Sequence, residues 1–279
     1  MSTKLASVPS DAMVSKQNIS KPPVLECTKL GITFGGLHAV EDFNLTIGNT
    51  EIAGLIGPNG AGKTTVFNLL TKVYQPTSGT IFLNGKDTHG MNTIRVNRAG
   101  IARTFQNIRL FGNLSVEDNV KAGMDGSLHY GYFSGLFRLP SYYREEKDAH
   151  ARAMELLSLF DMEGLANKKA DSLPYGAQRR LEIVRALATS PSLLLLDEPA
   201  AGMNPSETAE LMKNIRIIRD MFKIAVLLIE HDMSLVMTVC ESICVLNFGK
   251  IIAKGSPEVI QTDPAVIEAY LGRKAEAKK

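Results

Sequence analysis

Three short segments of the chain are apolar at almost every position. Residues 51–56, 193–196 and 224–229 have the length of strands rather than helices. A strand that is apolar on both faces must be covered on both faces, as in parallel sheets flanked by helices. The three segments therefore predict a buried, mainly parallel sheet.

Apolar residues at helical spacing lie between these strands. A helix is expected directly after residues 51–56, with Val66, Leu69, Leu70 and Val73 on its buried side. Together with the apolar strands, this alternation of strand and helix predicts an α/β fold.

A second helix is expected to begin near residue 204. Asn204 is a favourable N-cap, Pro205 suits the first helical position, and Glu207 is the third residue after the cap. The apolar residues that follow at helical spacing are Leu211, Ile215 and Ile218.

The region between residues 107 and 172 lacks comparable strand segments. Residues 145–160 instead favour a helix with Met154, Leu157 and Phe160 along one stripe. The predicted organisation is a disordered polar tail at 1–22, an α/β domain at 23–272 with a helical insertion at 107–180, and a charged tail at 273–279.

Composition narrows the classes of protein that are possible. The chain has 279 residues, of which 44% are apolar and 22% charged, as in an ordinary globular domain. Its 31 basic and 29 acidic residues give a net charge of +2, so charge does not favour a nucleic-acid partner. No apolar segment is long enough to span a bilayer, and the N-terminus lacks the apolar core of a signal peptide.

The sequence contains three cysteines, a small and odd number that argues against a disulfide framework. Cys240 and Cys244 are one helical turn apart, a spacing that could hold a metal. We interpret them as small core residues on one helix face, because no His or Cys cluster completes a tetrahedral site.

A glycine-rich motif follows the first apolar strand and precedes a helix. It matches G-x-x-x-x-G-K-[ST], a phosphate-binding loop, in the structural context that this motif requires. Its backbone N–H groups and the helix N-terminus favour phosphate oxygens, its lysine faces the β- and γ-phosphates, and its threonine hydroxyl suits Mg²⁺. The candidate nucleotide-binding residues are Gly57, Pro58, Asn59, Gly60, Ala61, Gly62, Lys63, Thr64 and Thr65.

An acidic pair ends the second apolar strand. Asp197 is expected to hold Mg²⁺, and Glu198 to orient or deprotonate the attacking water. Asp-Glu pairs alone are common, but together with a phosphate-binding loop they indicate a nucleotide hydrolase. The guanine motif Asn-Lys-x-Asp is absent, since Asn167-Lys168 is not followed by the required Asp, and ATP is therefore favoured over GTP.

At this point the chain resembles the ABC transporter ATPases, over residues 24–272. The resemblance rests on five further segments in the family's order. They are Phe34 in an expected adenine-stacking position, Arg103-Thr104-Phe105-Gln106 as the glutamine loop that contacts the membrane subunit, Leu173-Pro174-Tyr175-Gly176-Ala177-Gln178-Arg179-Arg180 as the signature segment, Ala201-Gly202-Met203-Asn204-Pro205 as the loop between paired subunits, and His231 as the γ-phosphate histidine.

The resemblance implies a function and a set of partners. The expected fold is a P-loop core with an N-terminal antiparallel β portion and an inserted helical subdomain. Glu198, His231 and Gln106 are the expected catalytic residues, Thr64, Gln106 and Asp197 the Mg²⁺ ligands, and Tyr175 and Gly176 contacts to nucleotide. Two such ATPases would sandwich two ATP molecules and drive transmembrane permease subunits, which in turn receive solute from a solute-binding protein. The chain would lie peripherally on the cytoplasmic face of the inner membrane, without nucleic acid.

A narrower resemblance is to the ATPase subunits of branched-chain amino acid importers. It rests on residues 31–40, 125–150, 179–183, 229–236 and 266–272. Urea or short-amide importers and the lipopolysaccharide exporter remain alternatives. A soluble ABC protein that acts on nucleic acid would usually carry two such domains or a coiled-coil insertion, and a generic P-loop NTPase leaves the signature segment and His231 unexplained.

The signature segment departs from the family pattern. Pro174 and Ala177 replace a serine and a glutamine, and Tyr175 replaces a glycine. Pro174 offers neither a hydroxyl nor a backbone N–H. The sequence therefore favours a heterodimer with a different ATPase chain over a homodimer.

Overall fold

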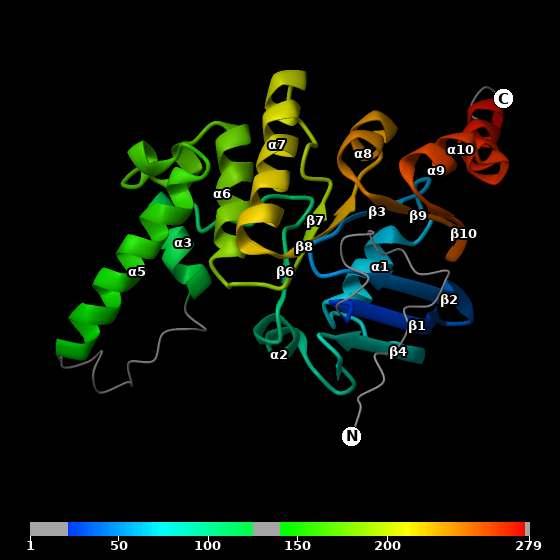
Figure 1. Cartoon of the computed structure of the whole chain (residues 1–279), viewed down its shortest axis with the longest axis horizontal. Helices are drawn as coiled ribbons and strands as arrows, with labels where there is room; N and C mark the ends of the chain where they lie inside the picture. The colour runs from blue at the N-terminus through cyan, green and yellow to red at the C-terminus, as the bar shows by residue number, and fades with distance from the viewer. Residues whose placement is uncertain (1–21, 125–139, 277–279) are drawn as a thin grey trace. The chain divides into compact units, whose positions relative to one another are not determined.

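The computed structural model describes residues 22–124 and 140–276, with no account of side chains at 140–142 and 271–276 (Figure 1). The chain divides into two compact units. The first unit contains the chain up to Arg103, Ser192–Pro199 and the chain from Ile215, and the second contains Thr104–Pro191 and Ala200–Asn214.

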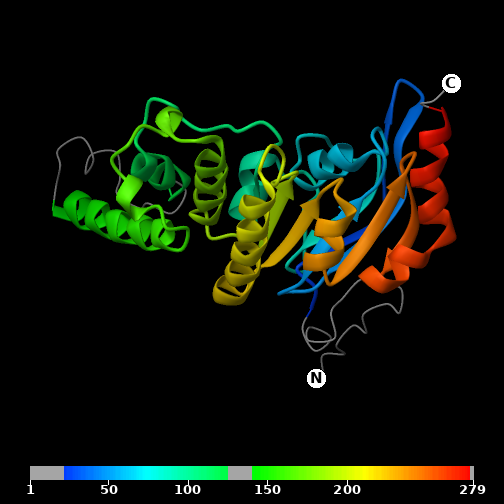
Figure 2. The ribbon, with the colours of Figure 1, turned by 90° about the horizontal axis from the view of Figure 1, so that it is seen from above.

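A six-stranded sheet forms the centre of the first unit. Five of its strands run parallel, and only the edge strand β10 is antiparallel to its neighbour. The strand order can be followed in Figures 1 and 2. Across the sheet the strands are β10 (Lys250–Gly255), β9 (Ser242–Asn247), β3 (Ile52–Ile56), β8 (Ala225–Ile229), β7 (Leu193–Asp197) and β6 (Ile101–Arg103).

The three strands predicted from apolar segments are β3, β7 and β8, and every residue in them is buried. They lie next to one another in the sheet, so both faces are covered, as the sequence requires. Gly54 of β3 permits a close approach, because a Cβ there would lie 3.0 Å from a methyl of Val236 in α8 (Met233–Val239).

A second, four-stranded sheet in the same unit is antiparallel, which confirms the expected N-terminal β portion. Side chains from both sheets and from α1 (Lys63–Leu70) form one apolar core. In order across the sheet, the strands are β2 (Leu37–Ile47), β1 (Leu25–Phe34), β4 (Ser78–Leu83) and β5 (Lys86–Asp87).

The helix after β3 is shorter than predicted. Val66, Leu69 and Leu70 are buried in the core, but α1 ends at Leu70, and Val73 lies beyond it, exposed. The remaining helices of the first unit, besides α8, are α2 (Thr93–Arg98), α9 (Pro257–Thr262) and α10 (Pro264–Glu276).

The prediction of a shared helix face for two cysteines was wrong. Cys240 ends α8 as its C-cap, whereas Cys244 lies in β9, because the chain turns into the strand between them. Both thiols are buried, as is that of Cys27. Burial raises the pKa of Cys27 and Cys244 to about 12 and also raises that of Cys240.

The second unit is helical. Its described residues contain α3 (Val116–Met124), α5 (Pro140–Ser158), α6 (Tyr175–Leu187) and two short 3₁₀ turns at Glu163–Leu165 and Ala170–Ser172. Leu157 of the predicted stripe is buried within α5, Met154 is half-buried, and Phe160 is buried just past the helix end.

Helix α7 (Pro205–Phe222) begins in the second unit and ends in the first. Its start confirms the sequence prediction, because Asn204 and Glu207 cap each other: each side chain accepts a hydrogen bond of 3.0 Å from the other's backbone N–H. The three predicted apolar residues, Leu211, Ile215 and Ile218, are buried.

Among the described residues, every helix is too short or too polar to cross a bilayer. The predicted N-terminal tail lies almost wholly outside the described residues, as does the segment 125–139. Of the expected charged C-terminal tail, residues up to Glu276 continue α10.

Candidate active site

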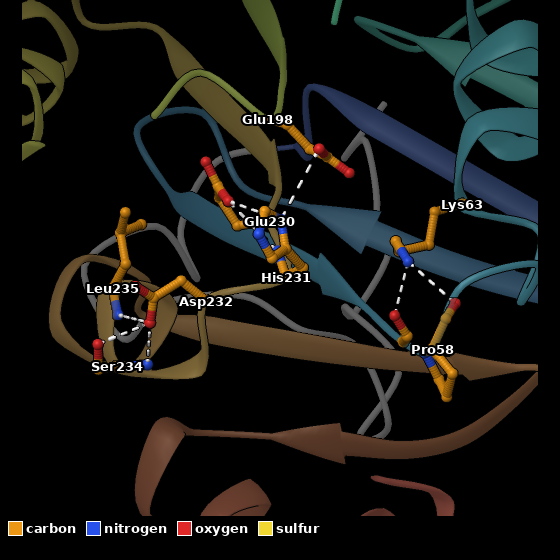
Figure 3. Close-up of polar contacts among 9 residues, drawn as sticks. Pro58, Lys63, Glu198, Glu230, His231, Asp232, Ser234 and Leu235 are labelled. Atoms are coloured by element: carbon orange, nitrogen blue, oxygen red, sulfur yellow. Dashed lines mark hydrogen bonds and ion pairs between the residues drawn. The ribbon is translucent and has the colours of Figure 1, made fainter. Parts of the chain in front are cut away.

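The strand order brings the predicted chemical groups to one edge of the six-stranded sheet. Because β3, β7 and β8 are parallel, their carboxyl ends meet there. Leu55 and Asp197 are both paired with Ile229, near the end of all three strands. The loops that follow these strands carry the phosphate-binding motif, Glu198 and His231 (Figure 3).

The phosphate-binding loop needs glycine at two positions where backbones meet. At Gly57, φ is 154° and a Cβ would lie 2.1 Å from the carbonyl oxygen of Leu246. At Gly62, the left-handed N-cap of α1, a Cβ would lie 2.9 Å from the carbonyl oxygen of Ala39. Gly62 has no side chain that could cap α1. The backbone N–H groups at the positive end of the helix therefore receive no hydrogen bond from a side chain of residue 62 and can bind phosphate.

Lys63 lies against the loop that it is expected to serve. Its side chain is buried, and its Nζ donates to the carbonyl oxygens of Gly57 at 2.6 Å and Pro58 at 3.1 Å (Figure 3). The ammonium group is thus held at the loop rather than in bulk solvent. Thr64, the next residue, is exposed, and Thr65 is half-buried.

Asp197 is buried at the end of β7, where it makes a contact that the sequence did not predict. One of its oxygens accepts from Arg103 Nη2 at 2.8 Å, and Arg103 Nη1 donates to the amide oxygen of Asn68 at 2.7 Å. The guanidinium also lies over the ring of Phe67, 5.4 Å from its centre. Arg103 therefore joins the Asp197 strand to α1.

Glu198 has an unusual backbone conformation, with φ of 46°. Its N–H donates to the carbonyl oxygen of Ile229 at 2.9 Å, which ties the residue to the end of β8. A left-handed conformation at a non-glycine residue is strained, and such strain gathers at functional sites. In Glu198 this backbone conformation helps to determine where the carboxylate points, directly after the end of β7.

The structure brings two of the expected catalytic residues, Glu198 and His231, together. His231 Nδ1 lies 3.7 Å from Glu198 Oε2 and 3.6 Å from Glu230 Oε2 (Figure 3). The Glu198 side chain is 21% exposed and that of His231 62%, so both can meet a ligand. Glu230 was not among the predicted site residues. Its carboxylate is buried, and its one signal in the sequence is its place beside His231.

Asp232 begins α8 directly after His231. Its Oδ1 accepts from the Ser234 hydroxyl at 2.6 Å and from the Ser234 backbone N–H at 2.9 Å. The Ser234 hydroxyl is the largest cause that lowers the pKa of Asp232. The cap fixes the start of the helix and with it the turn that carries His231.

Phe34 lies at the end of β1 and is 44% exposed, so it is not a core residue. Its ring meets Tyr74 edge to face, with ring centres 5.2 Å apart. An exposed aromatic ring held by a second ring is suited to stacking on a base.

The remaining predicted site residues, Gln106, Tyr175 and Gly176, belong to the second unit. Gln106 is exposed, and Tyr175 and Gly176 form the first turn of α6. Pro174 is the N-cap of α6 and makes no side-chain capping bond. A Cβ at Gly176 would lie 2.9 Å from Glu207 Oε1, so a carboxylate lies beside this helix start.

A phosphate-binding loop after one strand and an acidic pair after another, on one sheet edge, define a P-loop nucleotide hydrolase. The family model of the ABC transporter matches residues 40–201, and that of the branched-chain amino acid ATP-binding cassette transporter matches residues 250–276. The chain therefore belongs to the ABC transporter ATPases, in the family of the branched-chain amino acid transport ATP-binding proteins.

Comparison with individual proteins supports this membership. The chain is 46% identical to the high-affinity branched-chain amino acid transport ATP-binding protein BraF of Pseudomonas aeruginosa, over 90% of this chain and 98% of BraF. It is 47% identical to LivG of Escherichia coli over the same shares. The crystal structure of an ABC transporter ATP-binding cassette in its ADP conformation matches with a TM-score of 0.79 at 26% identity, over 90% of this chain and 100% of that one.

Proposed function

We propose that this chain hydrolyses ATP to energise the uptake of branched-chain amino acids through membrane permease subunits, on the cytoplasmic face of the inner membrane. The observation that carries the proposal is the meeting of the Lys63 loop, Asp197, Glu198 and His231 at one sheet edge. The substrate class comes from the relatives, whose names specify branched-chain amino acid transport.

The first step is binding of the ATP triphosphate by the phosphate-binding loop. Glycines at 57, 60 and 62 all have positive φ, which turns the backbone of the loop around a phosphate. Lys63 adds a positive charge at the loop, and Phe34 offers a ring for adenine. These contacts position ATP and offset its negative charge, which is most of what phosphoryl transfer requires.

Mg²⁺ fits two oxygen groups of the first unit. Thr64 supplies a hydroxyl and Asp197 a carboxylate, and hard oxygen ligands are those that Mg²⁺ prefers. When bound, the ion would neutralise charge that develops on the β- and γ-phosphates. Arg103 holds one Asp197 oxygen and so limits the orientations that this carboxylate can adopt.

The second step is attack by water on the γ-phosphate. We expect Glu198 to orient that water and accept its proton. We expect His231, whose Nδ1 lies 3.7 Å from Glu198 Oε2, to contact the γ-phosphate and to sense its loss. The products are ADP and inorganic phosphate, and the proton remains on Glu198 until it passes to solvent.

The proposed transporter also contains a second ATPase chain. Two ATPase chains would face each other, so that the ATP held by one chain is capped by the signature segment of the other. Because Pro174 lacks a hydroxyl and a backbone N–H, we favour a different ATPase chain as the partner, with permeases and a solute-binding protein completing the transporter.

Reconstitution of the chain with its permease and second ATPase in vesicles tests the proposal. We expect ATP-dependent accumulation of labelled leucine, isoleucine or valine that stops when Glu198→Gln replaces the native chain. ATP hydrolysis without accumulation of any of these solutes would reject the substrate class, and uptake that continues with Glu198→Gln would reject the site.

A further inference from the structure

Residues 104–114 of the described chain form neither helix nor strand, yet they carry Gln106. Backbone N–H and C=O groups in such a segment need hydrogen-bond partners outside regular secondary structure. In the second unit, buried side chains of α6 and α3 supply several of these partners.

Arg179 of α6 is fully buried and donates to two successive backbone carbonyls. Its Nη1 bonds the carbonyl oxygen of Phe105, and its Nη2 bonds that of Gln106 at 2.8 Å. A planar guanidinium that bonds two neighbouring carbonyls fixes the orientation of the peptide as well as its position.

Glu182 of α6 completes the arrangement from the same helix face, and its side chain is also buried. Its Oε2 accepts from Arg179 Nη1 at 2.9 Å, and its Oε1 accepts from the backbone N–H groups of Phe105 at 3.4 Å and Arg109 at 3.3 Å. The pair therefore contacts the donors as well as the acceptors of residues 105–109. Arg109 closes the turn by stacking on Phe105, 4.2 Å from its ring centre.

Asn119 of α3 holds the far end of the segment. Its amide oxygen accepts from the Phe111 N–H at 2.9 Å, and its Nδ2 donates to the carbonyl oxygens of Phe111 and Ser115, each at 3.0 Å. Residues 105–115 are thus fastened at both ends to buried polar side chains of helices in their own unit.

We propose that Arg179 and Glu182 are positioning residues that make the Gln106 loop and the start of α6 move as one piece. Arg179 lies one turn after Tyr175, where α6 begins. A buried ion pair is weak evidence for stability, and its better-attested use is to specify one arrangement. The proposal rests on the proposed function, in which the start of α6 faces the partner's ATP, and on the resemblance to the ABC transporter ATPases, which implies that the Gln106 loop contacts a permease. Displacement of one would then displace the other, which transmits nucleotide closure to the membrane subunits.

The decisive variant replaces both charges with apolar residues of similar size, Arg179→Met with Glu182→Leu. Such a swap removes the contacts to the loop without leaving a buried charge unpaired. Hydrogen exchange in the full-length chain should become at least tenfold faster in peptides that cover residues 104–110. Peptides that cover residues 53–62 should be unchanged, and ATP affinity should stay within twofold.

Arg179→Lys is the second variant, in case the double variant folds poorly. It keeps the charge beside Glu182 but replaces the fork with a single ammonium group, so exchange in 104–110 should rise about threefold. Lys121→Met is the matched control, because it breaks a pair of 2.7 Å with Glu117 on α3 of the same unit. It should leave 104–110 as in the native chain.

The assembled transporter supplies the functional readout. The double variant should transport at least threefold less solute for each ATP hydrolysed. Native exchange rates at 104–110 in both variants, or an unchanged transport ratio, would overturn the proposal. If the native complex transports nothing while the exchange rates change as expected, the proposed function fails, and the link between the loop and α6 stands without its role in transport.

Discussion

The side chains that this chain offers to its own ATP differ from those that it would offer to a partner's ATP under the proposed function. For its own ATP, the first unit provides a buried lysine at the loop, an exposed threonine, and the pair Glu198 and His231 at one sheet edge. For the ATP of a partner, the start of α6 provides glycine and backbone, behind a proline N-cap that makes no side-chain bond. Glu207 adds a carboxylate close to that helix start. We therefore expect binding and hydrolysis by this chain to depend on its own side chains, and capping of a partner's ATP to depend on the backbone geometry at the start of α6.

The largest expected effect is that of Glu198→Gln. The amide still fits the site but cannot accept a proton, so steady-state ATPase activity of the transporter should fall by about 100-fold or more. ATP binding should persist. Glu41→Gln is the control, since the Glu41 side chain forms an exposed pair with Lys250 in the same unit. Native-like ATPase activity in Glu198→Gln would remove the basis of the comparison.

Lys63→Ala should weaken ATP binding at least tenfold. A hydrogen bond to a charged group contributes about 1.5–3 kcal/mol, and 1.4 kcal/mol is a factor of ten in affinity. Equilibrium titration of the purified chain measures this effect. Lys250→Ala, a lysine with a 62% exposed side chain on the same unit, is the matched control and should bind ATP normally. Equal affinities for both variants would contradict the assignment of the loop.

Gln106→Ala tests the expected contact between the second unit and a permease. We expect severalfold less transport with little change in ATP affinity, because the side chain is exposed and its backbone carbonyl is already bonded by Arg179. Transport and binding assays on the same preparation would separate the two effects. Normal transport would show that the side chain is dispensable for coupling.

Pro174→Ser should restore a hydroxyl at the start of α6. If the proline weakens capping of the partner's ATP, ATPase activity at the partner's site should rise a few fold, measured with Glu198→Gln in this chain to silence its own site. A serine N-cap also stabilises a helix by about 1 kcal/mol, so Pro174→Ala, which loses the ring without gaining the hydroxyl, is the control. Equal rates in all three proteins would make Pro174 neutral and remove the argument for asymmetry.

The smallest expected effect concerns the N-caps of two helices. Pro174 makes no side-chain capping bond to α6, whereas the Asp232 side chain caps α8. Its pKa is lowered in the folded chain, so its contribution to stability is present above the ordinary aspartate pKa and is lost as pH falls through the folded value. Asp232→Ala should cost about 1 kcal/mol of unfolding free energy at pH 7 and much less in strongly acidic buffer. Asp232→Asn, which can still cap, should cost less at pH 7. A cost for Asp232→Ala that does not change with pH would contradict the charged cap.

Sequence patterns predicted the strands and the phosphate-binding loop because these are local. An apolar segment of five residues is buried wherever the sheet lies, and the glycine-rich motif carries its geometry within eight residues. The family resemblance covered Arg103, Arg179 and Glu182, but their contacts could not be predicted in this way. By composition each is an ordinary charged residue until the fold places it against Asp197 or against the backbone of residues 105–109.

Boundaries were predicted less well, for a related reason. The apolar pattern extended the first helix to Val73, but the chain turns after Leu70, and Val73 becomes exposed. The spacing of Cys240 and Cys244 likewise matched a helix, although a strand begins between them. Where a helix stops depends on what it packs against, which periodicity alone does not contain.

Because its cysteines are buried, the native chain should react only slowly with thiol-labelling reagents. Thiol reagents attack the thiolate, and burial keeps Cys27, Cys240 and Cys244 protonated and shielded at neutral pH. A single cysteine introduced at an exposed position of each unit would therefore react before any native one. Paired fluorescent or spin labels on the unmodified background could then follow the distance between the phosphate-binding loop and the Gln106 loop through a cycle of ATP hydrolysis.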